Sequence, residues 1–190
     1  MNLTPLNLVC WGAFAVVWFL GAVYNALKAP HTLTRRARYD SLILVLVIWG
    51  GMHAIPPTYW IVTQFHLLAL QIAGSFLLGV STLYTLWSRG ILGKMWANNA
   101  AIKEDHQFVT KGPYGITRHP IYTGLLGMIL GSTLSLGQGL GFLAFLLTLF
   151  FILNRIRHEE CLLVMTFGER YLEYKKHVPK LIPGWKGEKH

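Results

Sequence analysis

Residues that could bind an anion cluster immediately before the apolar segment that begins at Ile121. Arg118, His119 and Pro120 precede this segment, and Tyr122 lies just inside it. Pro120 suits the first position of a helix and His119 the cap, so the amides of the first turn and the Arg118 guanidinium could face one anionic ligand. Tyr122 could stack on a planar ring. A plain turn rich in proline and glycine explains the same residues.

The residues just upstream extend this candidate site. Lys111, Gly112, Pro113 and Tyr114 form a short run in which glycine lets the backbone approach a ligand closely. We therefore expect these four residues to contribute to ligand binding.

A pair of carboxylates lies near the end of the last long apolar segment. Adjacent side chains on a helix point about 100 degrees apart. Only one of Glu159 and Glu160 is therefore expected to face a site, while the other faces solvent or a basic partner. A solvated helix end with an ion pair between Arg155 and Glu159 is the alternative.

The C-terminal tail alternates aromatic and charged residues. Residues 167–174 carry this pattern, and Pro179 and Pro183 follow it. A short helix folded over the site could exclude water from a reaction. An amphipathic helix lying at a membrane surface fits the composition nearly as well.

The elements that must position these residues are membrane helices. The chain of 190 residues is 53% hydrophobic and only 13% charged, too apolar for an ordinary soluble domain. Uncharged windows of suitable length, divided at Pro56-Pro57 and at the glycine-rich turn 137–141, predict an all-α polytopic protein of about five spans. These spans are expected at residues 3–27, 41–55, 65–87, 120–136 and 140–156.

The charges sort onto one side of this arrangement. All 17 basic and all 8 acidic residues fall in the linkers 28–40 and 88–120 or after residue 154. The positive-inside rule then places the N-terminus outside and the C-terminus in the cytoplasm, with the candidate site on the cytoplasmic face. The net charge of +9 is thereby explained by topology and contact with membrane lipids, so no nucleic-acid partner is expected.

We interpret residues 1–190 as a single membrane domain. Residues 1–87 supply three N-terminal spans, and residues 88–190 form the half that binds a ligand in a pocket between the 88–120 linker, the fourth and fifth helices and the tail. Gly127 and Gly131 have the spacing of close helix packing. Cys10 and Cys161 lack metal-ligand spacing, so no metal site is predicted.

Four motifs together resemble the integral-membrane methyltransferases that include isoprenylcysteine carboxyl methyltransferases and phospholipid methyltransferases. The resemblance covers roughly residues 88–184, in the order of that family. The motifs are Gly112-Pro113-Tyr114, Arg118-His119-Pro120-x-Tyr122, Glu159-Glu160 and the tail from Phe167-Gly168 to Pro183. With 190 residues, the chain is most similar to the compact prokaryotic members.

The resemblance implies S-adenosylmethionine as the cofactor. Its carboxylate would suit the helix beginning at Pro120, with Arg118, and Glu160 would accept hydrogen bonds from its amino group. His119, Tyr122 and Glu159 would lie close by. Leu92, Gly93 and Trp96 resemble the stretch that forms part of the cofactor wall.

The implied reaction is methyl transfer to a lipid or other hydrophobic acceptor, with Glu160, His119 and Arg118 as the catalytic residues. A carboxylate acceptor is already a nucleophile at neutral pH, whereas an amine must first lose a proton. The sequence leaves this choice, the acceptor and the oligomeric state open. Two other interpretations remain: a membrane reductase related to the sterol reductases that binds NADPH, and a non-catalytic membrane scaffold.

Overall fold

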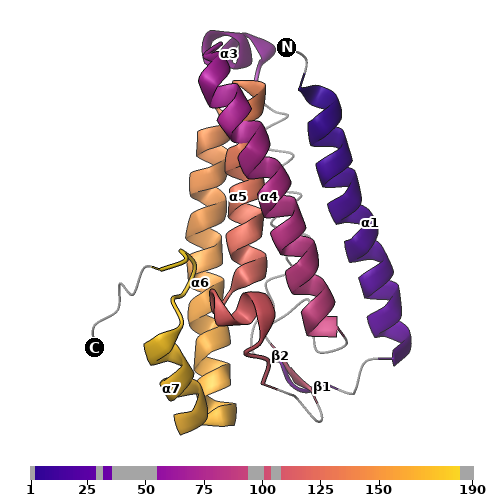
Figure 1. Ribbon diagram of the computed structural model, residues 1–190, viewed down its shortest axis with the longest axis vertical. Helices are drawn as coiled ribbons and strands as arrows, with labels where there is room; N and C mark the ends of the chain where they lie inside the picture. Colours follow the sequence, from indigo (N-terminus) through magenta and orange to yellow (C-terminus); the bar gives the residue numbers. More distant parts are fainter. Residues whose placement is uncertain (1–2, 29–31, 36–54, 94–100, 104–107, 185–190) are drawn as a thin grey trace.

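A bundle of long helices dominates the computed structural model (Figure 1), which describes residues 3–28, 32–35, 55–93, 101–103 and 108–184. Its long helices are α1 (Thr4–Lys28), α4 (Leu68–Leu92), α5 (Pro120–Leu136) and α6 (Gly141–Phe167). Among the described residues, α1, α4 and α6 are long and apolar enough to cross a membrane, whereas α5 is apolar but shorter. The predicted span 41–55 lies almost wholly outside the described residues.

Helices α4 and α5 pack closely because glycine faces the partner backbone. A methyl group at Gly131 would lie 2.6 Å from the backbone nitrogen of Leu78, and one at Gly74 would lie 2.5 Å from the backbone nitrogen of Ser135. Gly127 likewise faces the hydroxyl of Ser81. The predicted close packing through Gly127 and Gly131 is confirmed.

Helix α1 joins this pair through polar and apolar contacts. Asn7 Nδ2 donates to Ser135 Oγ at 2.9 Å, and Trp11 Nε1 donates to Ser132 Oγ at the same distance. Cys10 packs with buried residues of α4 and α5, Leu78 and Met128. Side-chain hydrogen bonds between helices stabilise membrane bundles by about 0.6 kcal/mol each on average.

The outer faces of the long helices expose large apolar side chains. Phe19 of α1 is 68% exposed, Phe76 of α4 74% and Phe150 of α6 60%. In water such surfaces would be costly, whereas a hydrocarbon phase accommodates them. The arrangement is that of an integral membrane protein.

Turns form one end of the bundle. Helix α3 (Pro57–Val62) starts at the second proline of Pro56-Pro57, as the predicted break requires. Gly137 ends α5 with φ of 64°, a left-handed conformation that favours glycine, and its carbonyl accepts from the amide of Phe65. The glycine-rich turn predicted at 137–141 is confirmed.

The opposite end carries the polar elements (Figure 1). A short antiparallel ribbon pairs β1 (Thr32–Arg35) with β2 (Ala101–Lys103). The 3-10 turn η2 (Gly112–Gly115) and α7 (Glu169–His177) lie at the same end. This ribbon is a small addition to the predicted all-α fold that the sequence did not indicate, because strands of four and three residues give little periodic signal.

The helices that correspond to the third and fifth predicted spans continue past the C-terminal ends of those spans. The third predicted span, 65–87, corresponds to α4 at Leu68–Leu92, and the fifth, 140–156, corresponds to α6, which continues to Phe167. The charged residues after 154 ended the apolar window but not the helix, because charged side chains with straight apolar stems are compatible with helical structure. The extra turns of α6 carry Glu159 and Glu160.

Candidate functional site

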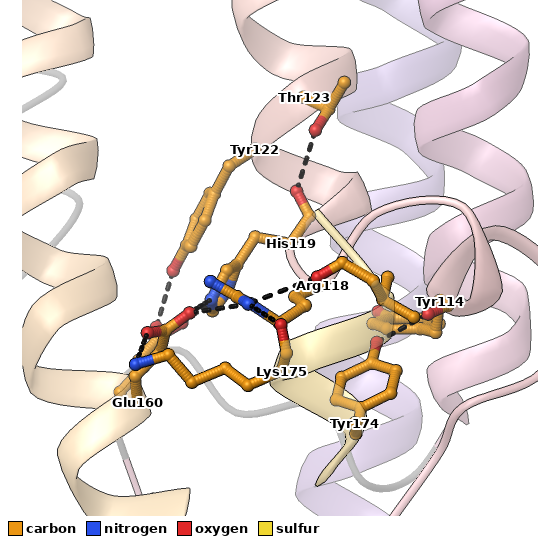
Figure 2. Close-up of polar contacts among 10 residues, drawn as sticks. Tyr114, Arg118, His119, Tyr122, Thr123, Glu160, Tyr174 and Lys175 are labelled. Atoms are coloured by element: carbon orange, nitrogen blue, oxygen red, sulfur yellow. Dashed lines mark hydrogen bonds and ion pairs between the residues drawn. The ribbon is translucent and has the colours of Figure 1, made fainter. Parts of the chain in front are cut away.

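The beginning of α5 and the end of α6 meet at a buried ion pair (Figure 2). Arg118 Nε lies 3.0 Å from Glu160 Oε1, and His119 Nε2 lies 3.3 Å from the same oxygen. The side chains of Arg118, His119 and Glu160 are 3%, 6% and 10% exposed. Burial of these charged and polar groups is tolerated because they contact one another.

His119 lies between both carboxylates of α6. Its Nδ1 is 3.7 Å from Glu159 Oε2, whereas its other ring nitrogen, Nε2, contacts Glu160. The Tyr122 ring stacks near the imidazole with centroids 5.8 Å apart, and its hydroxyl donates to Glu159 Oε1 at 2.5 Å. Arg155 Nε lies 3.0 Å from that same oxygen.

This geometry corrects the expectation that only one glutamate faces the site. Glu159 does pair with Arg155 four residues earlier, as the alternative predicted, but it also contacts Tyr122 and His119. The 100-degree separation along α6 is bridged because α5 places an imidazole between the two side chains. Both carboxylates therefore contact His119.

Helix α7 closes over this network. Arg118 Nη1 donates to the carbonyl oxygens of Lys175 at 2.8 Å and Val178 at 3.1 Å, at the C-terminal end of α7. Cations are favourable at helix C-termini, where carbonyl groups lack intrahelical partners. The Lys175 ammonium reaches back to lie 3.4 Å from Glu160 Oε2 (Figure 2).

Backbone hydrogen bonds fasten the segment that follows α7. The amide of Arg118 donates to Pro179 O at 2.8 Å, and the amide of His119 donates to Lys180 O at 3.2 Å. Thr123 Oγ1 donates to Leu181 O at 2.7 Å. The tail is therefore bound along the start of α5, as the predicted folded-back cap requires.

The turn η2 connects this site to α4. Gly112 has φ of 62°, which favours glycine, whereas Pro113 and Tyr114 are buried. Tyr84 of α4 donates from its hydroxyl to Pro113 O at 3.2 Å. The hydroxyl of Tyr174 on α7 donates to Tyr114 O, so η2 is held between the two helices.

Three tyrosines around the network remain neutral over a wide pH range. Burial raises the pKa of Tyr114, Tyr171 and Tyr174, since a phenolate loses hydration in such surroundings. Nearby Glu160 raises the pKa of Tyr171 further, and Arg118 offsets part of this effect. The hydroxyl of Tyr174 therefore persists as the donor to Tyr114 O.

The structure brings five of the predicted site residues into direct contact with one another. The network consists of Arg118, His119, Tyr122, Glu159 and Glu160, and Pro120 is the first residue of α5. Their contacts with a cofactor remain a prediction.

The other predicted residues lie outside this network, with Pro113 and Tyr114 buried in η2 next to it. Lys111 and Gly112 are exposed at the start of η2, and a methyl group at Gly112 would face Trp87 of α4. Leu92 and Gly93 end α4, where Gly93 lines an open groove of about 310 Å³ between α1 and α4. Trp96 lies outside the described residues.

Sequence reasoning missed the contribution of Lys175. The residue appeared only as one of many basic residues in the tail, and nothing in its spacing indicated contact with Glu160. The alternation of aromatic and charged residues around it did predict the helix, and the position of α7 beside Arg118 explains why one lysine of that helix turns inward.

Comparisons with known proteins support the same architecture. The sequence model of the isoprenylcysteine carboxyl methyltransferase family matches residues 66–165. A solved structure of the eukaryotic intramembrane Ras methyltransferase, an isoprenylcysteine carboxyl methyltransferase, superimposes with a TM-score of 0.62 and 22% identity, covering 97% of this chain and 70% of that one. At this identity the likeness concerns the fold.

Similar curated proteins are named protein-S-isoprenylcysteine O-methyltransferases. The protein of Schizosaccharomyces pombe is 43% identical over 81 residues, covering 42% of this chain and 34% of its own length. The human protein is 39% identical over 87 residues, covering 45% of this chain and 31% of its own. The match thus spans about a third of these relatives, and the family model covers more than half of this chain. The chain belongs to the isoprenylcysteine carboxyl methyltransferase family of integral membrane proteins.

Proposed function

We propose that the protein transfers a methyl group from S-adenosylmethionine to the carboxylate of a hydrophobic, lipid-linked acceptor at the cytoplasmic membrane face. The observation that carries this proposal is the meeting of α5 and α6 at the contact between Arg118 and Glu160, 3.0 Å apart. Family membership supports methyl transfer, and the charge distribution along the sequence supports the cytoplasmic location.

The residues of the network fit the amino-acid part of the donor. Glu160 offers a carboxylate whose Oε1 is fixed by Arg118 and His119, while Oε2 contacts the side chain of Lys175. A carboxylate oxygen held in this way can accept hydrogen bonds from the donor's ammonium group. Bound S-adenosylmethionine supplies a methyl group already activated by its positively charged sulfur.

The environment of Glu160 favours a carboxylate acceptor over an amine. Burial alone would raise the pKa of this carboxyl, but its contacts with His119, Arg118 and Lys175 outweigh burial and lower the pKa to about 2. The Glu160 carboxylate therefore keeps its negative charge at neutral pH and is a weak base. An acceptor carboxylate needs no base, because it is already a nucleophile at neutral pH, and the curated relatives are named O-methyltransferases.

The protein's own contribution is then alignment and exclusion of water. Arg118 holds α7 over the network through two carbonyl oxygens, and the tail is bound to the start of α5. A closed site increases the effective concentration of correctly oriented reactants and removes competing water. We expect the hydrophobic acceptor to enter sideways between helices, because the outer helix faces are apolar.

Binding and transfer can be tested separately on the full chain purified in lipid nanodiscs. Calorimetry should detect S-adenosylmethionine but not NADPH. Membrane extract incubated with protein and radioactive methyl donor should gain base-labile label, the behaviour of an ester. NADPH binding without S-adenosylmethionine binding would overturn the proposal in favour of a reductase, and base-stable label would indicate an amine acceptor.

Glu160→Gln keeps the size of the side chain and removes its charge. We expect this variant to bind S-adenosylmethionine about ten- to a hundredfold more weakly, and to lose transfer rate by the same factor at subsaturating donor, because a hydrogen bond to a charged group contributes about 1.5–3 kcal/mol. Glu173→Gln is the matched control, because Glu173 lies exposed on α7 and pairs with Lys176. Equal activity of Glu160→Gln and the control would remove Glu160 from the site.

A further inference from the structure

The two oxygens of Glu160 differ in what holds them. Oε1 contacts Arg118 Nε at 3.0 Å and His119 Nε2 at 3.3 Å, and the side chains of both partners are almost fully buried. Oε2 contacts Lys175 Nζ at 3.4 Å, and the Lys175 side chain is 22% exposed. One oxygen is therefore held by buried groups, and the other by a partly exposed side chain from α7 (Figure 2).

The backbone of Lys175 is held independently of its ammonium group. Its carbonyl oxygen accepts from Arg118 Nη1 at 2.8 Å, and Val178 O accepts from the same nitrogen. The ammonium can therefore leave Glu160 by rotation about side-chain bonds, with α7 still in place. Lysine suits such movement, because its charge sits on a flexible four-carbon stem.

We propose that Lys175 sets the affinity of the site for ammonium-bearing ligands by occupying Glu160 Oε2 in place of the ligand's own ammonium. This inference rests on the proposed function, in which Glu160 receives the amino group of S-adenosylmethionine. Two ammonium groups beside one carboxylate oxygen repel each other, so binding exchanges the lysine for the ligand. Lys175 is thus a residue that controls donor affinity, and Arg118 keeps the helix that carries it closed.

Removing the charge of Lys175 has a specific consequence under this proposal. Glu160 keeps its contacts with Arg118 and His119, so the carboxylate remains paired and the fold is retained. A ligand with an ammonium group no longer competes with an internal cation and binds more tightly. A ligand without an ammonium group is unaffected.

The experiment compares Lys175→Met with Lys176→Met by calorimetry in nanodiscs. Lys176 is the matched control, because it is the next residue on α7 and pairs with Glu173 at the surface. Three ligands distinguish the effect of the ligand's ammonium group from that of its carboxylate. S-adenosylhomocysteine carries both groups, its decarboxylated form carries the ammonium alone, and 5′-methylthioadenosine carries neither. Thermal unfolding of each variant checks that the fold is intact.

We expect Lys175→Met to bind the decarboxylated ligand about three- to tenfold more tightly than wild type, the range of a partly buried ion pair. Affinity for 5′-methylthioadenosine should stay within about twofold, and Lys176→Met should match wild type throughout. Equal affinity of wild type and Lys175→Met for the decarboxylated ligand, or an equal change for all three ligands, overturns the inference alone. Failure of wild type to bind S-adenosylhomocysteine overturns the proposed function, and this inference with it.

Discussion

The guanidinium of Arg118 holds the C-terminal end of α7 through the carbonyl oxygen of Lys175, 2.8 Å from Nη1. The same guanidinium lies 3.0 Å from Glu160 through its Nε. One buried side chain therefore joins α5, α6 and α7. Its planar fork of donors suits this task, because it can meet a carboxylate and two carbonyl groups in fixed directions.

Arg118→Lys should release α7 even though it preserves the charge. A lysine ammonium cannot reach the carboxylate of Glu160 and the carbonyls of Lys175 and Val178 with the same geometry, and each lost bond from a charged donor costs about 1.5–3 kcal/mol. We expect faster hydrogen exchange in residues 169–177, measured by mass spectrometry. Arg157→Lys, at an exposed position of α6, should leave exchange unchanged. Unaltered protection of α7 in Arg118→Lys would show that the tail is held without the guanidinium.

The close packing of α4 and α5 can be tested by comparing a glycine at the contact with a glycine away from it. Alanine at Gly131 would place a methyl group 2.6 Å from the Leu78 backbone, which cannot move aside, whereas alanine at Gly79 meets nothing within 4 Å. Gly131→Ala should lower the free energy of unfolding by about 1–3 kcal/mol through overpacking. Gly79→Ala should raise it by about 0.4–1 kcal/mol, because alanine restricts the unfolded chain. Unfolding in increasing concentrations of a denaturing detergent measures the free energy of unfolding of both variants. Equal changes for Gly131→Ala and Gly79→Ala would contradict the close approach of α4 and α5 at Gly131.

Local signals allowed parts of the fold to be predicted from the sequence. The fourth span was predicted at 120–136 and α5 runs from Pro120 to Leu136, because proline favours the first turn and glycine the C-terminal cap. The first span, predicted at 3–27, corresponds to α1 at Thr4–Lys28. Each of these ends depends on residues next to it in the chain.

Contacts between distant segments could not be predicted in the same way. The motif residues Arg118, His119 and Glu160 were expected in one site because of a family resemblance, and the packing of α5 against α6 supplies the distances. The inward turn of Lys175 depends on where Arg118 anchors α7, and spacing along the chain does not encode that position. The β1–β2 ribbon likewise pairs two linkers that are distant in the sequence, and spacing along the chain does not encode this pairing.

Tyr122 and Glu159 provide a test of the second carboxylate. Tyr122→Phe keeps the ring stacked near His119 but removes the hydroxyl that donates to Glu159 Oε1. We expect a loss of about 1.5–3 kcal/mol in the free energy of unfolding, the range for a hydrogen bond to a charged group. Tyr59→Phe is the control, because Tyr59 is 61% exposed.

A double-mutant cycle separates this bond from other effects of the substitution. Tyr122→Phe should cost much less in a Glu159→Gln background, where the acceptor has lost its charge. Additive effects of the two substitutions would show that the hydroxyl and the carboxylate do not stabilise each other.

The buried tyrosines predict how stability depends on alkaline pH. Burial raises the pKa of Tyr114, Tyr171 and Tyr174 above the ordinary value of 10.0. Below this value the hydroxyl is protonated in both folded and unfolded chains, so these groups give no pH dependence. As pH rises past 10.0, the phenols ionise in the unfolded chain first, and the folded state loses stability with a slope that approaches about 1.4 kcal/mol per pH unit for each tyrosine.

Substitution by phenylalanine should remove part of this dependence. Tyr171→Phe deletes one group that ionises only on unfolding, so its free energy of unfolding should fall less steeply than that of wild type between pH 10 and pH 11. Absorbance at 295 nm provides an independent measure, because phenolate absorbs there and the buried tyrosines should gain that absorbance only when the chain unfolds. Identical slopes for wild type and Tyr171→Phe would mean that Tyr171 ionises in the folded protein, which is incompatible with its burial beside the carboxylate of Glu160.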